Sequence, residues 1–176
     1  MFPCNLEALF IFEEKFNMPN FKNLNELRKH LQQKIDKTLI SKVADTIREA
    51  EHKNIDETVY DAYDPHVYQR RGDNGGIGDM RNMKAELVED GKLIVTNETK
   101  PNDNYNHSMP SSAPLAEVIE FGHGYNGYQY DYPPSNETPC GQPRPFIKNT
   151  YEELKNTGNH VDALKKGLRK QGILTK

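Results

Sequence analysis

Apolar side chains recur at helical spacing over a long early stretch of the chain. From Asn23 onward they return every three or four residues, which is the period of one face of an α-helix. Asn23, followed three residues later by Glu26, has the pattern of a capping box at a helix start. The pattern predicts one long N-terminal helix whose narrow stripe lies across a sheet and leaves a flank for another subunit. The stripe consists of Leu24, Leu27, Leu31, Ile35, Leu39, Val43 and Ile47.

The middle of the chain carries patterns typical of strands. The runs 83–89 and 92–99 flank Asp90-Gly91, a dipeptide that favours a type I′ hairpin turn. An earlier run at 58–63, Thr-Val-Tyr-Asp-Ala-Tyr, mixes β-branched and aromatic residues and predicts a further short strand. These runs together predict an antiparallel sheet.

A third pattern brackets a long loop. Leu115, Val118 and Ile119 give a short apolar face, and Gly122 is placed to end that helix. The Pro-Arg-Pro-Phe-Ile sequence at 143–147 predicts an extended approach to a C-terminal helix, because proline disfavours helix in the residue before it. Two apolar anchors therefore enclose a long exposed segment, an arrangement typical of a partner-binding loop on a rigid base.

Two helices are expected at the C-terminal end. The first covers 146–156 and is ended by Gly158, and the second begins at Asn159 and is ended by Gly172. The resulting order predicts an α+β fold, in which an antiparallel β-meander is packed with the long N-terminal helix and the C-terminal helices.

The domain is expected to occupy residues 23–176. Residues 1–22 form an N-terminal arm or an upstream extension, for which two interpretations stay open. Either translation begins at Met18, or a short arm packs on a neighbouring subunit. No apolar run is long enough to span a membrane.

Composition and charge add two constraints. Only 35% of residues are apolar, there is no Trp, and the mean hydropathy is −0.89, so the chain is short of core material for its length. Long polar loops or burial in an oligomer would explain this. The net charge of −3 is uneven, since residues 143–176 carry +5 and the rest carries −8. The acidic body argues against general nucleic-acid binding, whereas the basic C-terminal region allows a local contact.

Candidate chemical groups are scattered. Glu120 and His123 have a metal-ligand spacing, but a helix break and the lack of a second pair argue against a site. The Gly-rich loop 72–78 lacks the Lys-Ser/Thr of a phosphate cradle and indicates a mobile turn. Cys4 and Cys140 have no neighbouring base and fit a reducing compartment. The sequence therefore predicts no catalytic residue, metal or cofactor, and the protein is not expected to be an enzyme.

Tyrosines are concentrated in the bracketed segment. Four of them fall within eight residues, beside glycines and a Pro-Pro pair. Tyrosine offers a large contact area and a polar tip, so such a cluster favours a protein interface. The alternative is that two of the four side chains fold back on the domain. Arg144 is expected to face solvent or to pair across the interface. The four tyrosines are Tyr125, Tyr128, Tyr130 and Tyr132.

Several of these motifs occur together in one known family. The Val-Ile-Glu-Phe-Gly block, the loop and the Arg-Pro-Phe-Ile start of a terminal helix resemble the head–tail joining (tail-completion) proteins of long-tailed bacteriophages and prophages. Upstream, the long first helix, the Gly-rich passage at 71–76 and the Asp90-Gly91 hairpin extend the resemblance over residues 23–172. Two features depart from it: residues 1–17 have no expected counterpart, and the 122–142 loop is unusually long and rich in tyrosine.

The resemblance implies a structural virion protein of the phage neck. It would form a ring, expected to be hexameric, that joins the head connector to the tail tube or terminator proteins, after assembly in the host cytoplasm. DNA would pass through the lumen, with non-specific contacts from the basic C-terminal helix. The alternative is a cytoplasmic DNA- or protein-binding module that uses the basic C-terminal helices. The cations expected to face the lumen or DNA are Lys165, Lys166, Arg169 and Lys170.

Overall fold

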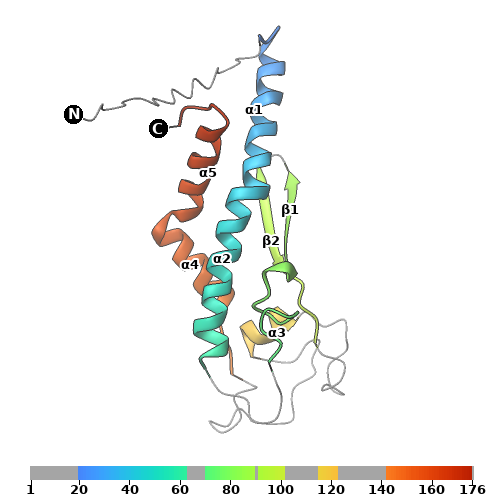
Figure 1. Ribbon diagram of the computed structural model, residues 1–176, viewed down its shortest axis with the longest axis vertical. Coiled ribbons are helices and arrows are strands. Elements are labelled where there is room, and N and C mark those ends of the chain that lie inside the picture. The colour runs from blue at the N-terminus through green and yellow to red at the C-terminus, as the bar shows by residue number, and fades with distance from the viewer. Residues whose placement is uncertain (1–19, 63–69, 90, 102–114, 123–141, 176) are drawn as a thin grey trace, which may run out of the picture.

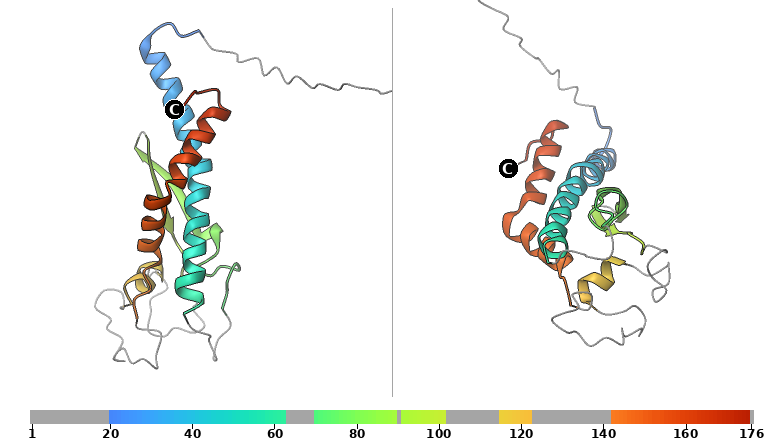
Figure 2. Two further views of the ribbon diagram at one scale, coloured as in Figure 1. Left: turned by 90° about the vertical axis from the view of Figure 1, so that its left-hand side faces the viewer. Right: turned by 60° about the horizontal axis from the view of Figure 1, so that its bottom comes forward.

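The protein is built around one long helix with a layer on each side. The computed structural model describes residues 20–62, 70–89, 91–101, 115–122 and 142–175. Helices α4 and α5 lie on one side of the long helix and the β1–β2 hairpin lies on the other, with α3 near the base of the hairpin (Figure 1, Figure 2). The helical elements are α1 (Leu24–Thr38), α2 (Ala44–Ile55), α3 (Leu115–Phe121), α4 (Phe146–Thr157) and α5 (Asn159–Lys170), and the strands are β1 (Met83–Glu89) and β2 (Lys92–Asn97).

The long helix starts as the capping pattern predicts. The Glu26 N–H donates to Oδ1 of Asn23 at 2.9 Å, and the Glu26 carboxylate reaches back to the N–H of Lys22 at 2.9 Å. A π-helical turn at Leu39–Val43 links α1 to α2, and a second one at Asp56–Tyr60 continues α2. The helix therefore runs without interruption for about 55 Å at 1.5 Å per residue.

The strand predicted at 58–63 is wrong in its described part. Helix continues to Tyr60 and a turn follows at 61–62. Ile55 and Val59 lie four residues apart and are both buried, so the apolar positions keep the helical phase. Extending an existing helix adds a hydrogen bond for each residue that it fixes, and this outweighs the weak β preference of the segment.

The hairpin forms where the sequence places it. Its strands are antiparallel, with Met83 opposite Asn97 and Leu87 opposite Leu93, and the register shifts between Leu87 and Glu89. Gly91 has φ +79°, whereas Asp90 lies outside the described residues, so the type I′ turn stays a prediction. The α+β class is confirmed, and the sheet of the described residues is this two-stranded hairpin.

The side chains of the hairpin are buried at its base and become more exposed toward its tip. Met83 is 1% exposed, whereas Leu87 is 37% exposed. The base packs on the main core, in which the partly buried Tyr60, Val95 and Ile119 surround a fully buried set. That set consists of Ile55, Val59, Ile77, Met83, Ala116 and Phe146.

The two C-terminal helices pack along the long helix. Gly158, at φ +69°, ends α4 as expected, but Asn159 lies in the first turn of α5 and makes no side-chain cap. Lys34 Nζ donates to the Gln171 carbonyl oxygen at 2.6 Å, and Gln171 Nε2 donates to Thr38 Oγ1 at 2.6 Å. A Cβ on Gly167 would lie only 2.3 Å from Cγ2 of Thr38, so a small residue is needed where α5 crosses α1.

Phe146 and Ile147 give a direct test of this core. Phe146 is fully buried. The sequence predicts that it packs together with Ile147 or Leu154; Ile147 is 45% exposed, whereas Leu154 is half-buried. Phe146→Ala should lower the free energy of unfolding by about 3–5 kcal/mol, because it empties an aromatic core site. Ile147→Ala and Arg144→Ala should each cost much less. Denaturant unfolding of the three variants measures this, and equal losses at 146 and 147 would contradict the assignment.

Candidate partner-binding site at the clamp between α3 and α4

One carboxylate joins α3 to the start of α4. Helix α4 begins after Pro145, which offers no capping side chain. Instead, Glu120 Oε2 accepts from the N–H of Ile147 at 2.8 Å and Oε1 accepts from the N–H of Lys148 at 3.1 Å. The first N–H groups of a helix have no partner within it and carry partial positive charge, so a carboxylate there both satisfies and stabilises them. Glu120 is itself buried.

The backbone of α3 makes the second part of the connection. Gly122 has φ +66°, and a Cβ on it would lie 2.3 Å from the Pro143 nitrogen, so only glycine fits both the conformation and the space. The Arg144 N–H donates to the Ile119 carbonyl oxygen at 3.0 Å. These contacts define the clamp, made by Ile119, Glu120 and Gly122 on one side and by Pro143, Arg144, Ile147 and Lys148 on the other.

The clamp brings together the two ends of the tyrosine-rich segment. The segment 123–141, with Tyr125, Tyr128, Tyr130 and Tyr132, lies outside the described residues, but its flanking residues are adjacent. Arg144 is half-buried within the clamp. The predicted bracketing by two anchored ends is therefore confirmed, while the contacts of the four tyrosines stay a prediction.

The role of Glu120 was missed in the sequence because its partners are distant. The carboxylate and the Ile147 N–H that it caps are 27 positions apart. The available signal is indirect: a helix that begins directly after Pro145, with no Ser, Thr, Asp or Asn at its cap position, needs a cap from elsewhere.

The cations predicted on α5 belong to a larger basic surface. Lys166, Arg169 and Lys170 are exposed and Lys165 is half-buried. Helix α1 lies beside α5, and the two helices together hold eight lysines and arginines against three acidic residues. This basic pole therefore carries +5, while the whole chain carries −3.

In the Gly-rich loop 72–78 the second half, residues 76–78, is buried, whereas Asp73 and Asn74 are exposed. Gly76 and Gly78 are buried. The Gly76 carbonyl oxygen accepts from Asn82 Nδ2 at 3.1 Å and from Thr99 Oγ1 at 3.3 Å. The predicted turn is present, but it forms part of the core wall and is not the mobile turn that the sequence indicates.

Two buried carboxylates fix this loop to its neighbours. Asp79 accepts from Arg81 Nη2 at 2.7 Å, and this guanidinium holds the pKa of Asp79 well below its ordinary value. Glu51 Oε1 accepts from Asn97 Nδ2 at 3.0 Å. Burial raises the pKa of Glu51; the hydrogen bond from Asn97 opposes this change and the charge of Glu120 adds to it.

The described residues contain no group of three His, Cys, Asp or Glu side chains placed to hold a metal ion. Glu120 is used in the clamp, and His123 lies outside the described part of the chain. No described helix is long and apolar enough to cross a membrane.

Glu51 predicts a pH effect of known sign. Its pKa is raised in the folded state, so its contribution to stability is present below the ordinary value of 4.5 and is lost as pH rises through the folded value. Glu51→Gln keeps an acceptor for Asn97 but cannot ionise. Its free energy of unfolding, relative to that of the wild type, should therefore increase as pH rises from about 4 to about 7. Urea titrations at both pH values measure this, and a difference that shrinks with rising pH would contradict it.

Comparison with known proteins places the chain in a family. The sequence profile of the YomN family matches residues 23–170, which include the long helix, the hairpin, the clamp and all but the end of the C-terminal region. One relative, described as the SPbeta prophage-derived uncharacterized protein YomN of Bacillus subtilis (strain 168), is 38% identical over 123 residues, covering 70% of this chain and 73% of the relative. The family thus includes a prophage protein. No solved structure matches the chain. The chain belongs to the YomN family.

Proposed function

We propose that this protein is a structural component of a phage neck that joins the head connector to the tail as a ring subunit. The clamp is the observation that carries the proposal. A buried carboxylate, a glycine that tolerates no side chain and a backbone hydrogen bond all serve to hold two chain ends together. Two fixed ends of this kind are typical of a partner-binding loop carried by a rigid base.

The chemistry of the enclosed segment favours a protein partner. Its four tyrosines combine large apolar rings with hydrogen-bonding tips, which is the composition of interface anchors. The prophage origin of the YomN relative supports a partner among phage proteins. By resemblance to the joining proteins, the partners are further copies of the chain in a hexameric ring, the head connector, and the tail tube or terminator proteins.

The basic pole fits the lumen of such a ring. A channel through which any DNA sequence passes makes no base-specific contacts and binds DNA through its phosphates alone. Exposed cations on α5 and α1 supply contacts of that kind. The same surface also favours a second candidate function, a DNA-binding module that acts in the host cytoplasm.

We infer a structural and not a catalytic role. Three buried carboxylates make contacts that hold the fold together. Glu120 caps α4, Asp79 binds Arg81 and Glu51 binds Asn97. Each of these contacts explains the residue without a substrate.

Cryo-electron microscopy of the intact phage particle tests the placement. The proposal expects density for this fold between the connector and the tail tube, in a closed ring of identical subunits. Particles that contain a complete neck without this chain would contradict it.

The tyrosines should separate folding from joining. Replacing Tyr125, Tyr128 and Tyr130 together by Ser should leave the melting temperature nearly unchanged, since exposed loop side chains contribute little to folding. The same variant should fail to join heads to tails, because truncated interface anchors lose binding energy. Complementation of a null phage measures joining, and calorimetry measures melting. A large drop in melting temperature with normal joining would instead place the tyrosines in the core.

The cations of α5 should separate the two candidate functions. Replacing Lys165, Lys166, Arg169 and Lys170 together by Gln should leave stability nearly unchanged, since three of the four side chains are exposed and Lys165 is half-buried. In the neck, the variant should still join heads to tails but alter DNA retention or ejection, with a strong dependence on salt. Loss of DNA binding by the isolated chain, in a phage that assembles and ejects normally, would favour the cytoplasmic module.

A further inference from the structure

The free edge of β1 can be identified from the pairing within the hairpin. The Glu98 N–H donates to the Asn82 carbonyl oxygen at 2.9 Å, so the pair 82/98 is hydrogen-bonded. Hydrogen-bonded and non-hydrogen-bonded pairs alternate along an antiparallel ladder. The backbone groups of Met83, Ala85 and Leu87 therefore point away from β2. The Met83 carbonyl oxygen agrees with this, because it accepts from Arg48 Nε of α2 at 2.7 Å.

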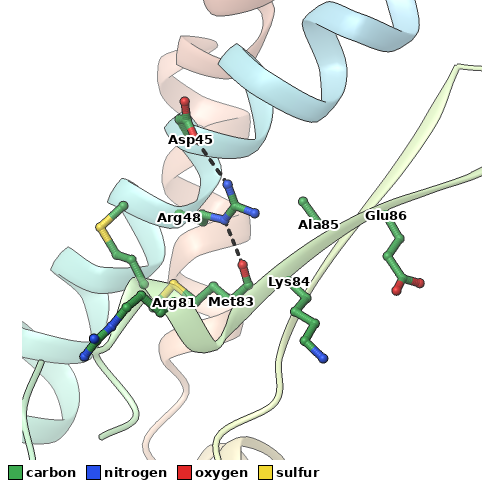
Figure 3. A pocket seen from close by; sticks show the side chains of 8 residues that line it. Asp45, Arg48, Arg81, Met83, Lys84, Ala85 and Glu86 are labelled. Atoms are coloured by element: carbon green, nitrogen blue, oxygen red, sulfur yellow. Dashed lines mark hydrogen bonds and ion pairs between the residues drawn. The ribbon is translucent and has the colours of Figure 1, made fainter. Parts of the chain in front are cut away.

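An open groove runs along this edge. It has a volume of about 490 Å³ and lies between α2, represented by Asp45 and Arg48, and the outer side of β1 (Figure 3). Among the described residues no second strand pairs with this edge of β1. An unpaired edge is a template for another strand, and a two-stranded sheet gains stability from added strands.

We propose that β1 pairs antiparallel with β1 of a second copy of the chain, about a two-fold axis at Ala85. In this register Ala85 lies opposite Ala85, Met83 lies opposite Leu87, and Lys84 lies opposite Glu86. Ala85 can exchange both backbone hydrogen bonds with its copy. At the Met83–Leu87 pair one bond can form, because the Met83 N–H already donates to the Met80 carbonyl oxygen. The Met83 carbonyl oxygen accepts from Arg48 and has a second lone pair for the Leu87 N–H of the other copy.

The charged side chains of β1 favour this pairing register and a second copy of the chain as the partner. An axis at Lys84 or at Glu86 would place like charges opposite each other, whereas an axis at Ala85 places Lys84 opposite Glu86 twice. An axis at Leu87 would place Glu86 opposite Val88. Lys84 is also ion-paired to Glu98 within its own hairpin, so each pair adds to a charged row on the outer face.

The apolar side of the strand is also complementary to itself. Leu87, near the tip of the hairpin, is 37% exposed, whereas Met83 lies at the buried base. Antiparallel pairing brings each Leu87 beside the base of the other hairpin and covers it. The contact is isologous and uses the edge of β1, not the clamp residues or the cations of α5, so it does not depend on the proposed neck function.

Charge reversal provides the decisive experiment. Wild-type chain should form a dimer in sedimentation equilibrium, with a population that rises with concentration. Lys84→Glu and Glu86→Lys should each weaken dimerisation roughly tenfold, because each turns both cross-strand pairs repulsive. An equimolar mixture of the two variants should restore it, since every pair is again attractive. Circular dichroism of each variant confirms that it is folded.

Three outcomes would overturn the proposal. These are a wild-type chain that stays monomeric at the highest soluble concentration, single variants that dimerise as well as the wild type, and a mixture that dimerises no better than its components. If the charges instead protect the edge from pairing, as charges on edge strands often do, their reversal would leave the chain monomeric throughout.

A disulfide test fixes the register. Hydrogen-bonded antiparallel partners have Cα atoms about 5.5 Å apart, within the range of a disulfide. In a background with Cys4→Ser and Cys140→Ser, Ala85→Cys should form a covalent dimer roughly tenfold or more faster than Thr96→Cys, because pairing raises the local concentration of the thiol. Thr96 is exposed on β2 and provides the matched control. Equal rates for the two variants would exclude the Ala85 axis.

Discussion

The two hydrogen bonds from the first turn of α4 to the Glu120 carboxylate hold the lower half of this fold together. Without them the start of α4 would keep unpaired N–H groups beside the core, at a cost of roughly 1–3 kcal/mol for each buried group. The same bonds place Phe146 against the hairpin base and fix the direction in which the chain leaves α3. Glu120 therefore supports both the core packing and the position of the loop ends, together with Gly122 and the Arg144–Ile119 backbone hydrogen bond.

The long helix is the element that both layers share. On one side its Asn54 and Lys53 side chains bind Glu153 of α4, at 2.8 Å and 3.0 Å. On the other side Glu51 binds Asn97 at the end of β2. Polar and apolar contacts together fix the orientation of the long helix. As a result α1, its cationic first half, lies beside α5 in the basic pole. Charge separation along the molecule is thus a consequence of the packing.

The elements with a local signal could be predicted from the sequence. The helix cap at Asn23, the hairpin around Gly91, the helix stop at Gly158 and the buried Phe146 all depend on residues close to one another in the chain. Such signals survive because capping, turn conformation and apolar periodicity act over a few residues.

The errors have a common cause in distant contacts. The β-branched and aromatic side chains after Ile55 predict a strand. The segment stays helical because it continues the preceding helix and because Val59 packs in the core. The sequence of the Gly-rich loop indicates a mobile turn because the hydrogen bond that holds it, from Thr99 Oγ1 to the Gly76 carbonyl oxygen, spans 23 positions. The capping role of Glu120 has no local signal for the same reason, since the Ile147 N–H that it binds lies 27 positions away. The two anchored ends of the bracketed loop could thus be predicted, whereas the carboxylate cap that joins them could not.

Excision of the tyrosine-rich segment tests the central claim that the clamp closes the fold without it. Residues 123–141 would be replaced by a short Gly-Ser-Gly linker, which can join the adjacent ends at Gly122 and Gln142. Denaturant unfolding should stay cooperative, with a free energy within about 1 kcal/mol of the wild-type value or higher, because a shorter loop costs less entropy to close. Loss of the cooperative transition would show that the segment is part of the core and would contradict the claim.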